Sequence, residues 1–323
     1  FTADDMASYK AEWGEPIAID YRGFRIYTPP PPCSSFQVLQ TLKLMEVLTE
    51  SPMGFQDPQG LHLLIESIKL AAADRINHAG DPDYATAPIK ELLSEDYARQ
   101  QSKRVNSVAS MGPIAGEHYA KDRIDGVLKH GSPEEFGSGM TSCYSVTDRD
   151  GNVVSVMQTL GDGFGSGAAV GDTGIFLNNM AHLFDLDEGS PNQIGPGKRP
   201  DLVVSPVLVF SGDKCYLSMG TPGSYGILQT TPQFLMNVLD LGMTVQQAIE
   251  SPRVKVIRGR NVHMEEQFPS HVQESLRGLG HEIEIIEAWS RSVGGAQGIM
   301  IDREHGTFQG GADPRRDGFA LGW

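Results

Sequence analysis

Residues 141–160, in the middle of the chain, constrain the fold more than any other part of the sequence. They read TSCYSVTDRDGNVVSVMQTL, and apolar and polar residues alternate on both sides of Asp150-Gly151. An Asp-Gly pair between two alternating runs is a strong signal for a β-hairpin. The preceding residues, 136–140, read FGSGM and have no regular pattern. Thr141 is therefore predicted to open a strand directly after a loose segment.

The composition indicates a globular protein that binds neither nucleic acid nor a membrane. The chain has 323 residues, enough for one large domain or two ordinary ones, and 39% of them are hydrophobic. Its net charge of −15 argues against nucleic acid and anionic membrane surfaces, because both bind basic patches. No apolar run approaches the roughly 20 residues of a transmembrane helix. Residues 1–14 show no signal peptide and read like the middle of a longer protein.

The cysteines and histidines indicate neither a disulfide framework nor a metal site. Cys33, Cys143 and Cys215 are few and scattered. No C-x-x-C or H-x-x-x-H spacing is present, so no metal and no cofactor is expected. Cys143 lies two residues after Thr141, on the same face of the predicted strand. It has no base beside it in the sequence, and an inert core thiol is the better interpretation.

The first 105 residues are predicted to be mainly helical, with one hairpin. Alternation around Arg22-Gly23 predicts the hairpin at 17–27, and the four prolines that follow end it. Capping residues and apolar periodicity predict helices at 6–10, 36–48, 61–79 and 89–101. Residues 106–140 contain six glycines and little apolar periodicity, so a mobile linker or tail is expected there.

From residue 141 onward the pattern is mainly that of strands. Strands are expected at 143–149, 152–160, 174–178, 203–210, 214–219, 254–257, 282–287, 296–302 and 306–310. Helices are expected at 225–241, 245–250 and 270–279. Two groups of strands with helices outside them predict an α+β fold, a sandwich of two sheets between two helical layers. Residues 1–140 and 141–323 together would form this single αββα domain.

Several segments of the chain resemble a known family. The segments are TADDMASYKAEWGEP, DYRGFRIYTPPPP and KLAAADRINHAGDPDY in the first part, and TSCYSVTDRDGNVVS, TGIFLNN, GPGKRPDLVVSP, GTPGS, IESPR and GGADPR in the second. With them the chain resembles the γ-glutamyltransferase family, with its cephalosporin-acylase-like and other amidohydrolase relatives, over essentially its whole length. This resemblance implies the four-layer αββα sandwich of N-terminal-nucleophile hydrolases.

The resemblance implies a proenzyme that cleaves itself between Met140 and Thr141. Residues 1–140 would be the C-terminal portion of a large subunit, and residues 141–323 the small catalytic subunit, held together as a heterodimer. The long N-terminal part of the family's large subunit is not in this sequence, and the arginine that binds the α-carboxylate lies in that part. Family members are often periplasmic or secreted, and the sequence itself indicates no compartment.

The implied chemistry centres on the hydroxyl of Thr141. In maturation its Oγ would attack the carbonyl of Met140, and in turnover it would attack a small-molecule amide, with the freed α-amine as general base. The predicted hairpin places Thr159 opposite Thr141, and the resemblance gives Thr159 the role of hydrogen-bonding to the nucleophile. It also gives the N–H groups of Gly223 and Ser224 the role of the oxyanion hole, at a strand–helix junction.

The sequence departs from the family where the family binds an amino-acid head group. Apolar or absent side chains stand at these positions: Gly161 for Asn, Met180 for Gln, Leu183 for Asp, and Leu202-Val203 for a Ser-Ser pair. The polar residues left nearby are His182 and Asp201, and His182 alone is more typical of a structural histidine. Specificity built on buried hydrogen bonds is lost with its partners, so weak glutathione activity and a less polar acyl donor are expected.

Three further segments bear on this interpretation. Residues 189–198 are shorter than in family members with a lid over the donor site, and an open pocket favours hydrolysis over transpeptidation. Phe164-Gly165-Ser166-Gly167 is predicted to be a turn, and Asp313-Pro314-Arg315 a structural cap beside the site.

Two alternatives stay open. One is a standard γ-glutamyltransferase, or glutathione hydrolase, that binds glutamate through rearranged residues. The other is an uncleaved precursor or scaffold without catalytic activity.

Overall fold

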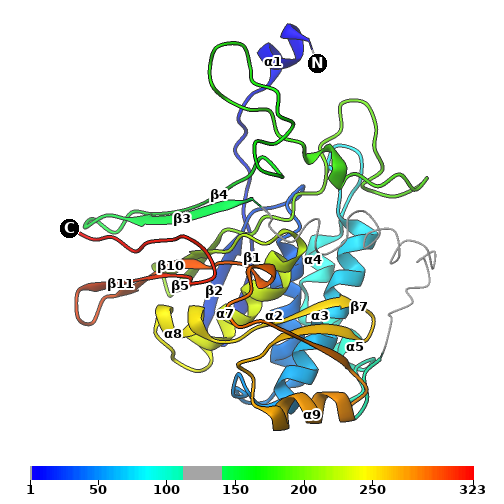
Figure 1. The fold of residues 1–323 in the computed structure, drawn as a ribbon, viewed down its shortest axis with the longest axis vertical. Helices are drawn as coiled ribbons and strands as arrows, with labels where there is room; N and C mark the ends of the chain where they lie inside the picture. Colours follow the sequence, from blue (N-terminus) through cyan, green and yellow to red (C-terminus); the bar gives the residue numbers. More distant parts are fainter. Residues whose placement is uncertain (1, 112–139) are drawn as a thin grey trace.

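A six-stranded antiparallel sheet is the largest element of the computed structural model, which describes residues 2–111 and 140–323 (Figure 1). Its strand order is β1-β2-β5-β6-β10-β11. The strands are β1 (Ile17–Tyr21), β2 (Phe24–Thr28), β5 (Val207–Ser211), β6 (Lys214–Gly220), β10 (Gln297–Asp302) and β11 (Thr307–Ala312). Strand β2 pairs with β5, so the two portions on either side of residue 140 share one sheet.

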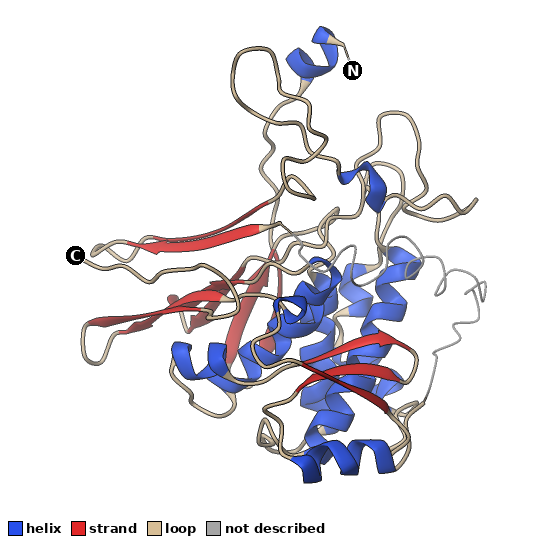
Figure 2. Ribbon diagram, in the orientation of Figure 1, coloured by secondary structure: helices blue, strands red, loops and turns tan. Residues whose placement is uncertain are grey.

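Helices cover one face of this sheet. The main hydrophobic core lies between the sheet and helices α2 (Phe36–Leu48), α7 (Ile227–Leu239) and α8 (Val245–Glu250). Tyr21 and Ile26 of the sheet and Leu39 of α2 are fully buried in this core. Helices α3 (Pro58–His78) and α5 (Glu95–Ser102) pack behind α2 (Figure 2). In the described part of the chain, no helix is both long and apolar enough to cross a membrane.

The predicted central hairpin is confirmed and lies on the other face of the sheet. Strands β3 (Ser142–Thr147) and β4 (Val153–Gln158) pair from Ser142↔Gln158 to Thr147↔Val153. The hairpin packs against β6 and β10, and Ser145 Oγ accepts a 2.8 Å hydrogen bond from Ser218. The described residues therefore form a helical layer, a six-stranded sheet and a narrow second sheet. The α+β class is confirmed.

A third sheet stands apart from the first two. Strands β7 (Val254–Arg258), β8 (Asn261–Glu265) and β9 (Glu282–Ile286) form it, and α9 (Ser270–Gly278) covers it. β8 and β9 run parallel. A second hydrophobic cluster joins this sheet to α3 through Leu61 and Ile65.

Several elements differ from the expectation. The first helix, α1, is Ala3–Ser8, because Thr2 and Asp5 form a capping box. The helix expected at 89–101 is divided into α4 (Ile89–Leu92) and α5, since Ser94 caps the second piece. Residues 174–178 form no strand and contribute one isolated bridge, Ala169↔Phe176.

The stretch expected to be a mobile linker or tail, 106–140, lies mostly outside the described residues, which stop at 111 and resume at 140. The described start of this stretch is anchored. Ser110 N–H donates to Leu279 O at 2.6 Å, and Met111 N–H donates to a carboxylate oxygen of Glu66 at 3.0 Å.

Four buried charged residues join the C-terminal elements. Arg253 pairs with Asp313, and Arg315 pairs with both Asp313 and Glu265. All four side chains are at most 4% exposed. Arg315 holds Glu265 through two hydrogen bonds of 2.8 and 2.6 Å and stacks on Trp289. The segment Asp313-Pro314-Arg315 therefore lies in a buried ion-pair network.

We expect Arg315→Met to lower the free energy of unfolding by about 3–5 kcal/mol, because the buried Glu265 carboxylate loses its cationic partner. Urea denaturation measures this change. Arg99→Met is the matched control, since the Arg99–Glu95 pair is exposed, and it should cost less than about 0.5 kcal/mol. Equal effects of the two substitutions would contradict a stabilising role for the network.

Candidate active site

The Met140–Thr141 peptide bond lies at the open end of the central hairpin. The register Ser142↔Gln158, continued by one residue, places Thr141 opposite Thr159. Met140 N–H donates to Gly161 O at 3.3 Å. The hairpin thus holds the expected cleavage point beside residues 159–161.

Thr159 is close to the expected place but makes a different hydrogen bond. Its hydroxyl accepts the N–H of Gly161 at 2.9 Å. The structure records no hydrogen bond from Thr159 to Thr141 within residues 2–111 and 140–323. The backbone turns back at Gly161, whose φ is +91°, and this turn presents its N–H to Thr159.

The strand that carries Thr141 crosses the end of β6. A Cβ on Gly220 would lie only 3.2 Å from Cβ of Cys143. Burial raises the pKa of the Cys143 thiol to about 12, so it carries no thiolate at neutral pH. Residues 221–224 continue from β6 into the short helix η2 (Ser224–Gly226) and then into α7. The turn and the strand that follows Thr141 therefore start from one crossing point.

Two backbone N–H groups of this turn are available as donors. Neither Gly223 nor Ser224 donates its N–H to any partner among the described residues. Both groups lie at the beginning of a helix, where the backbone dipoles favour negative charge. Such donors can stabilise an oxyanion that develops during acyl transfer.

The turn is held in an uncommon conformation. Gly223 has φ of +138°, and a Cβ there would lie 3.1 Å from Cα of Gly294. Ser224 has φ of +54°, in the left-handed region that favours glycine. Gly295 N–H binds the Thr221 hydroxyl at 3.1 Å. The packing of 294–295 therefore fixes the direction of the turn.

Gly161 packs against the chain just before and at the start of η1 (Met180–Leu183), the short helix that carries Met180, His182 and Leu183. A Cβ at Gly161 would lie 1.9 Å from Oδ1 of Asn179 and 3.2 Å from Sδ of Met180, so the family's Asn has no space here. Met180 and Leu183 are buried at the ends of η1. His182, in the same helix, is exposed, and its Nδ1 lies 2.7 Å from Asn179 O.

The other three predicted contacts face elsewhere. Asp201 is buried and bound to Ser34 Oγ and, at 3.0 Å, to Arg75 Nη1. Burial raises the pKa of Asp201 against the opposing effect of Arg75. Val203 lies in the main core, and Leu202 pairs with the backbone of residues 32–34. Asp201 is therefore engaged in an internal ion pair and Val203 in the main core.

Arg75 is a residue that the sequence reasoning missed. Its guanidinium lies 4.6 Å from the ring centroid of Tyr225, which directly follows Ser224. It also binds Asp201 and, at 3.0 Å, Oε1 of Gln37. The helical period puts Arg75 on the same side of α3 as the buried Ile68 and Ala71. A charged residue on the apolar side of a predicted helix was the sequence signal for a buried arginine.

Comparison with known proteins shows which family this chain is similar to. The family model described as Gamma-glutamyltranspeptidase matches residues 1–323. The chain is 34% identical to the glutathione hydrolase proenzyme of Bacillus subtilis (strain 168), over 99% of this chain and 55% of the relative. It is 31% identical to the Acylase ACY 1 proenzyme of Pseudomonas sp. (strain SE83), over 97% of this chain and 53% of the relative.

A solved structure shows the same similarity in three dimensions. The crystal structure of cephalosporin acylase from Bacillus halodurans superposes with a TM-score of 0.87 at 30% identity. The match covers 100% of this chain and 55% of that one. The chain thus spans about half the length of the curated relatives that it matches.

We expect Gly161→Asn, which restores the family residue, to cost about 2–4 kcal/mol of stability through backbone strain and the clash with Asn179. Thermal or urea denaturation tests this. Gly167→Asn is the control, because Gly167 also has positive φ but no atom lies within 4 Å of its Cβ position. A Gly161→Asn protein as stable as the control would show that the space around residue 161 opens without cost.

Proposed function

The chain belongs to the gamma-glutamyltranspeptidase family, and we propose on this basis that it is a self-processing amide hydrolase or acyltransferase with Thr141 as nucleophile. The observation that carries the proposal is the pair of unpartnered N–H groups at Gly223 and Ser224, on a turn that starts where the Thr141 strand crosses β6. The family to which the chain belongs contains amidohydrolases and transpeptidases.

Maturation begins at the Met140 carbonyl. Thr141 Oγ attacks this carbonyl, the C–N bond breaks, and the acyl group moves from nitrogen to oxygen. Water then hydrolyses the resulting ester, which leaves a carboxylate on Met140 and a free α-amine on Thr141. The tight turn at Gly161 supports this step, because it holds the Met140 N–H and so limits the motion of the scissile bond.

Turnover uses the same hydroxyl. The free α-amine takes the Oγ proton as Oγ attacks the substrate carbonyl, and it returns that proton to the leaving amine. The oxyanion formed between these steps accepts hydrogen bonds from Gly223 and Ser224. Water or a second amine then releases the acyl group from Thr141. We place Thr159 beside this centre as a positioning residue, through its hydrogen bond to Gly161.

The acyl donor that we propose is less polar than a γ-glutamyl group. Gly161, Met180 and Leu183 offer no side-chain hydrogen bond to an amino-acid head group, and Asp201 is occupied by Arg75 and Ser34. His182 is the exposed polar side chain among the predicted contacts. The similarity to named acylases supports an acyl-amide substrate. We further propose that hydrolysis prevails over transfer, since the short 189–198 segment leaves the site open to water.

We also propose that the fold is the αββα sandwich of N-terminal-nucleophile hydrolases. The support comes from the outer face of the central hairpin. Tyr144, Val146 and Val154 are 46–53% exposed there and form an apolar surface, which an outer helical layer would bury. The two products of cleavage would remain one heterodimer, because β2 and β5 pair across them in the large sheet.

Replacement of Thr141 tests the proposal directly. Denaturing electrophoresis of the wild type should show fragments 1–140 and 141–323, whereas Thr141→Ala should stay intact and lack amide turnover. Thr141→Ser keeps a hydroxyl and should still divide. Ser142→Ala removes the exposed neighbouring hydroxyl and should behave as wild type. Cleavage of the Thr141→Ala chain at the same bond would refute the assignment.

An assay with γ-glutamyl anilide, cephalosporin side-chain amides and small amides tests the donor. Higher turnover of the acyl amides than of the γ-glutamyl compound is the expected result. Strong γ-glutamyl turnover would overturn the proposed donor class and favour a standard glutathione hydrolase. It would leave the role of Thr141 unchanged.

A further inference from the structure

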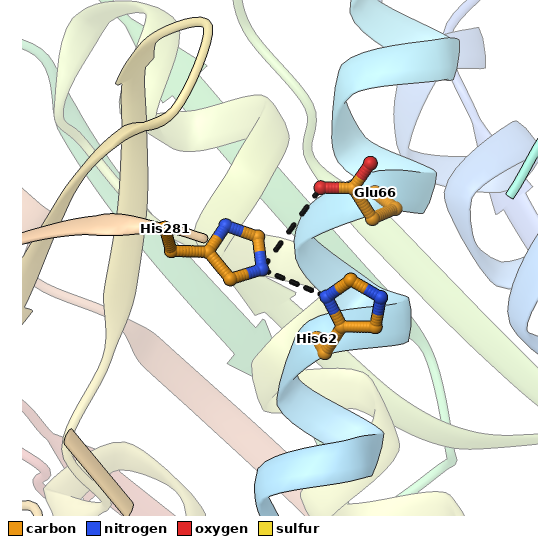
Figure 3. A group of neighbouring side chains, drawn as sticks. All are labelled: His62, Glu66 and His281. Carbon is orange, nitrogen blue, oxygen red and sulfur yellow. Dashed lines mark hydrogen bonds and ion pairs between the residues drawn. The ribbon is translucent and has the colours of Figure 1, made fainter. Parts of the chain in front are cut away.

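A buried polar cluster lies where α3, the end of the 106–111 segment and the beginning of β9 meet. Figure 3 shows His62 and Glu66 one helical turn apart on α3, with His281 facing both from the other portion of the chain. His62 Nδ1 lies 2.8 Å from His281 Nε2, and Glu66 lies 4.0 Å from His281. All three side chains are buried. Local spacing in the sequence could not reveal the cluster, because 219 positions separate the two histidines.

The cluster holds the 106–111 segment. His62 Nε2 lies 2.7 Å from Asn106 O. Glu66 accepts hydrogen bonds from Ser110 Oγ at 3.2 Å and from Met111 N–H at 3.0 Å. Lys69 donates to Glu66 at 2.6 Å and to Ser110 Oγ at 2.9 Å. The contacts therefore bind residues 106–111 through both side-chain and backbone groups.

The geometry assigns the protons of the two imidazoles. The carbonyl of Asn106 only accepts, so His62 Nε2 carries a hydrogen. A neutral His62 then has a lone pair at Nδ1, and His281 Nε2 donates to it. His281 Nδ1 is left as a buried acceptor without a hydrogen-bond partner among the described residues. His281 is neutral in this arrangement.

Direct hydrogen bonds explain the cluster better than a metal ion does. Two imidazole nitrogens that share a tetrahedral zinc ion at about 2.0–2.1 Å lie roughly 3.3 Å apart, whereas these lie 2.8 Å apart. The Lys69 ammonium already neutralises Glu66. A divalent cation would have to displace this ammonium or share the carboxylate with it.

We propose that His62, Glu66, Lys69, Ser110 and His281 form a clasp that fastens residues 106–111 to the 141–323 portion and stays closed while the His281 imidazole is neutral. Its contacts across the two portions are the His62–His281 hydrogen bond and the bond from Ser110 N–H to Leu279 O. After cleavage the clasp would help to hold the two products together, and this consequence rests on the proposed cleavage at Thr141. The closure of the clasp does not depend on cleavage.

Added protons should open the clasp. A proton on His281 Nδ1 adds a buried charge near the cations Lys69 and Arg260. Glu66, on α3, is the anion that faces them. Burial, with the neighbouring Lys69, His62 and Arg260, lowers the pKa of His281 to about 3. Because the pKa of His281 is lower in the closed state than in the open state, the closed state is fully stabilised above about pH 6.5. This stabilisation of the closed state is lost progressively as the pH falls below that value.

Amide hydrogen exchange of residues 106–111, corrected for intrinsic rates, tests the clasp. It is measured in the full chain carrying Thr141→Ala, so that cleavage does not enter. Between pH 6.5 and pH 5.0 we expect the opening constant to rise about 16-fold, because His281 in the open state is half protonated at pH 6.5 and almost fully protonated at pH 5.0. His281→Gln should reduce this rise to less than about threefold, because a glutamine amide can still pair with His62 and does not titrate.

Two controls make the result decisive. His271→Gln replaces an exposed histidine on α9 and should keep the wild-type pH dependence. The proposal would be overturned if the opening constant of the Thr141→Ala chain did not depend on pH. It would also be overturned if adding His281→Gln left the pH dependence unchanged. Protection of 106–111 by added zinc at pH 7.5 that is lost in His281→Gln would also overturn it, in favour of a metal site. Electrophoresis of the wild type separately reports whether cleavage occurs.

Discussion

The buried ion pairs of Arg253, Glu265, Asp313 and Arg315 are the constraint on which the C-terminal elements depend. Removing four charges from water is costly, and only complete hydrogen bonding offsets that cost. Backbone groups provide the remaining bonds: Arg315 donates to the carbonyls of Ile249 and Ser251, and Glu265 accepts the N–H of Arg253. The end of α8, the start of β7 and the end of β8 are therefore held as one unit.

This network extends to the turn that presents the unpartnered N–H groups. Glu265 accepts the N–H of Ser290, Arg253 donates to Val293 O, and Asp313 accepts the N–H of Ala296. Residues 290–296 are thus fixed at both ends, and Gly294 between them packs against Gly223. Donors stabilise a developing charge best when they need no reorganisation. The ion pairs supply that rigidity from outside the turn.

The sequence predicts the elements whose signals are local, and it misses those that depend on distant partners. Helices α2 and α8 and the central hairpin have the predicted bounds within one or two residues, because periodicity, a capping box or an Asp-Gly turn specifies each of them. Strand β8 was not expected, since it buries Glu265 against an arginine 50 positions away. The anchoring of Ser110 was equally hidden, because Glu66 and Leu279 are remote in the sequence.

The site shows the same division. The motifs place Thr141 directly before the central hairpin, next to the pair Ser142↔Gln158, and place Gly223 and Ser224 at a helix start. The ion pair of Asp201 with Arg75 was not predicted, because 126 positions separate the two residues.

The replacements around Gly161 depend on one another through packing, which cannot be read from each sequence position separately. Asn179 and Met180 fill the space of a side chain at 161, so the missing Asn and the missing Gln belong to one packing arrangement. Met180 is buried, so a polar side chain restored there alone would be buried without its partners, at a cost of about 1–3 kcal/mol. The proposed donor class therefore rests on residues that pack together around 161, and not on independent single replacements.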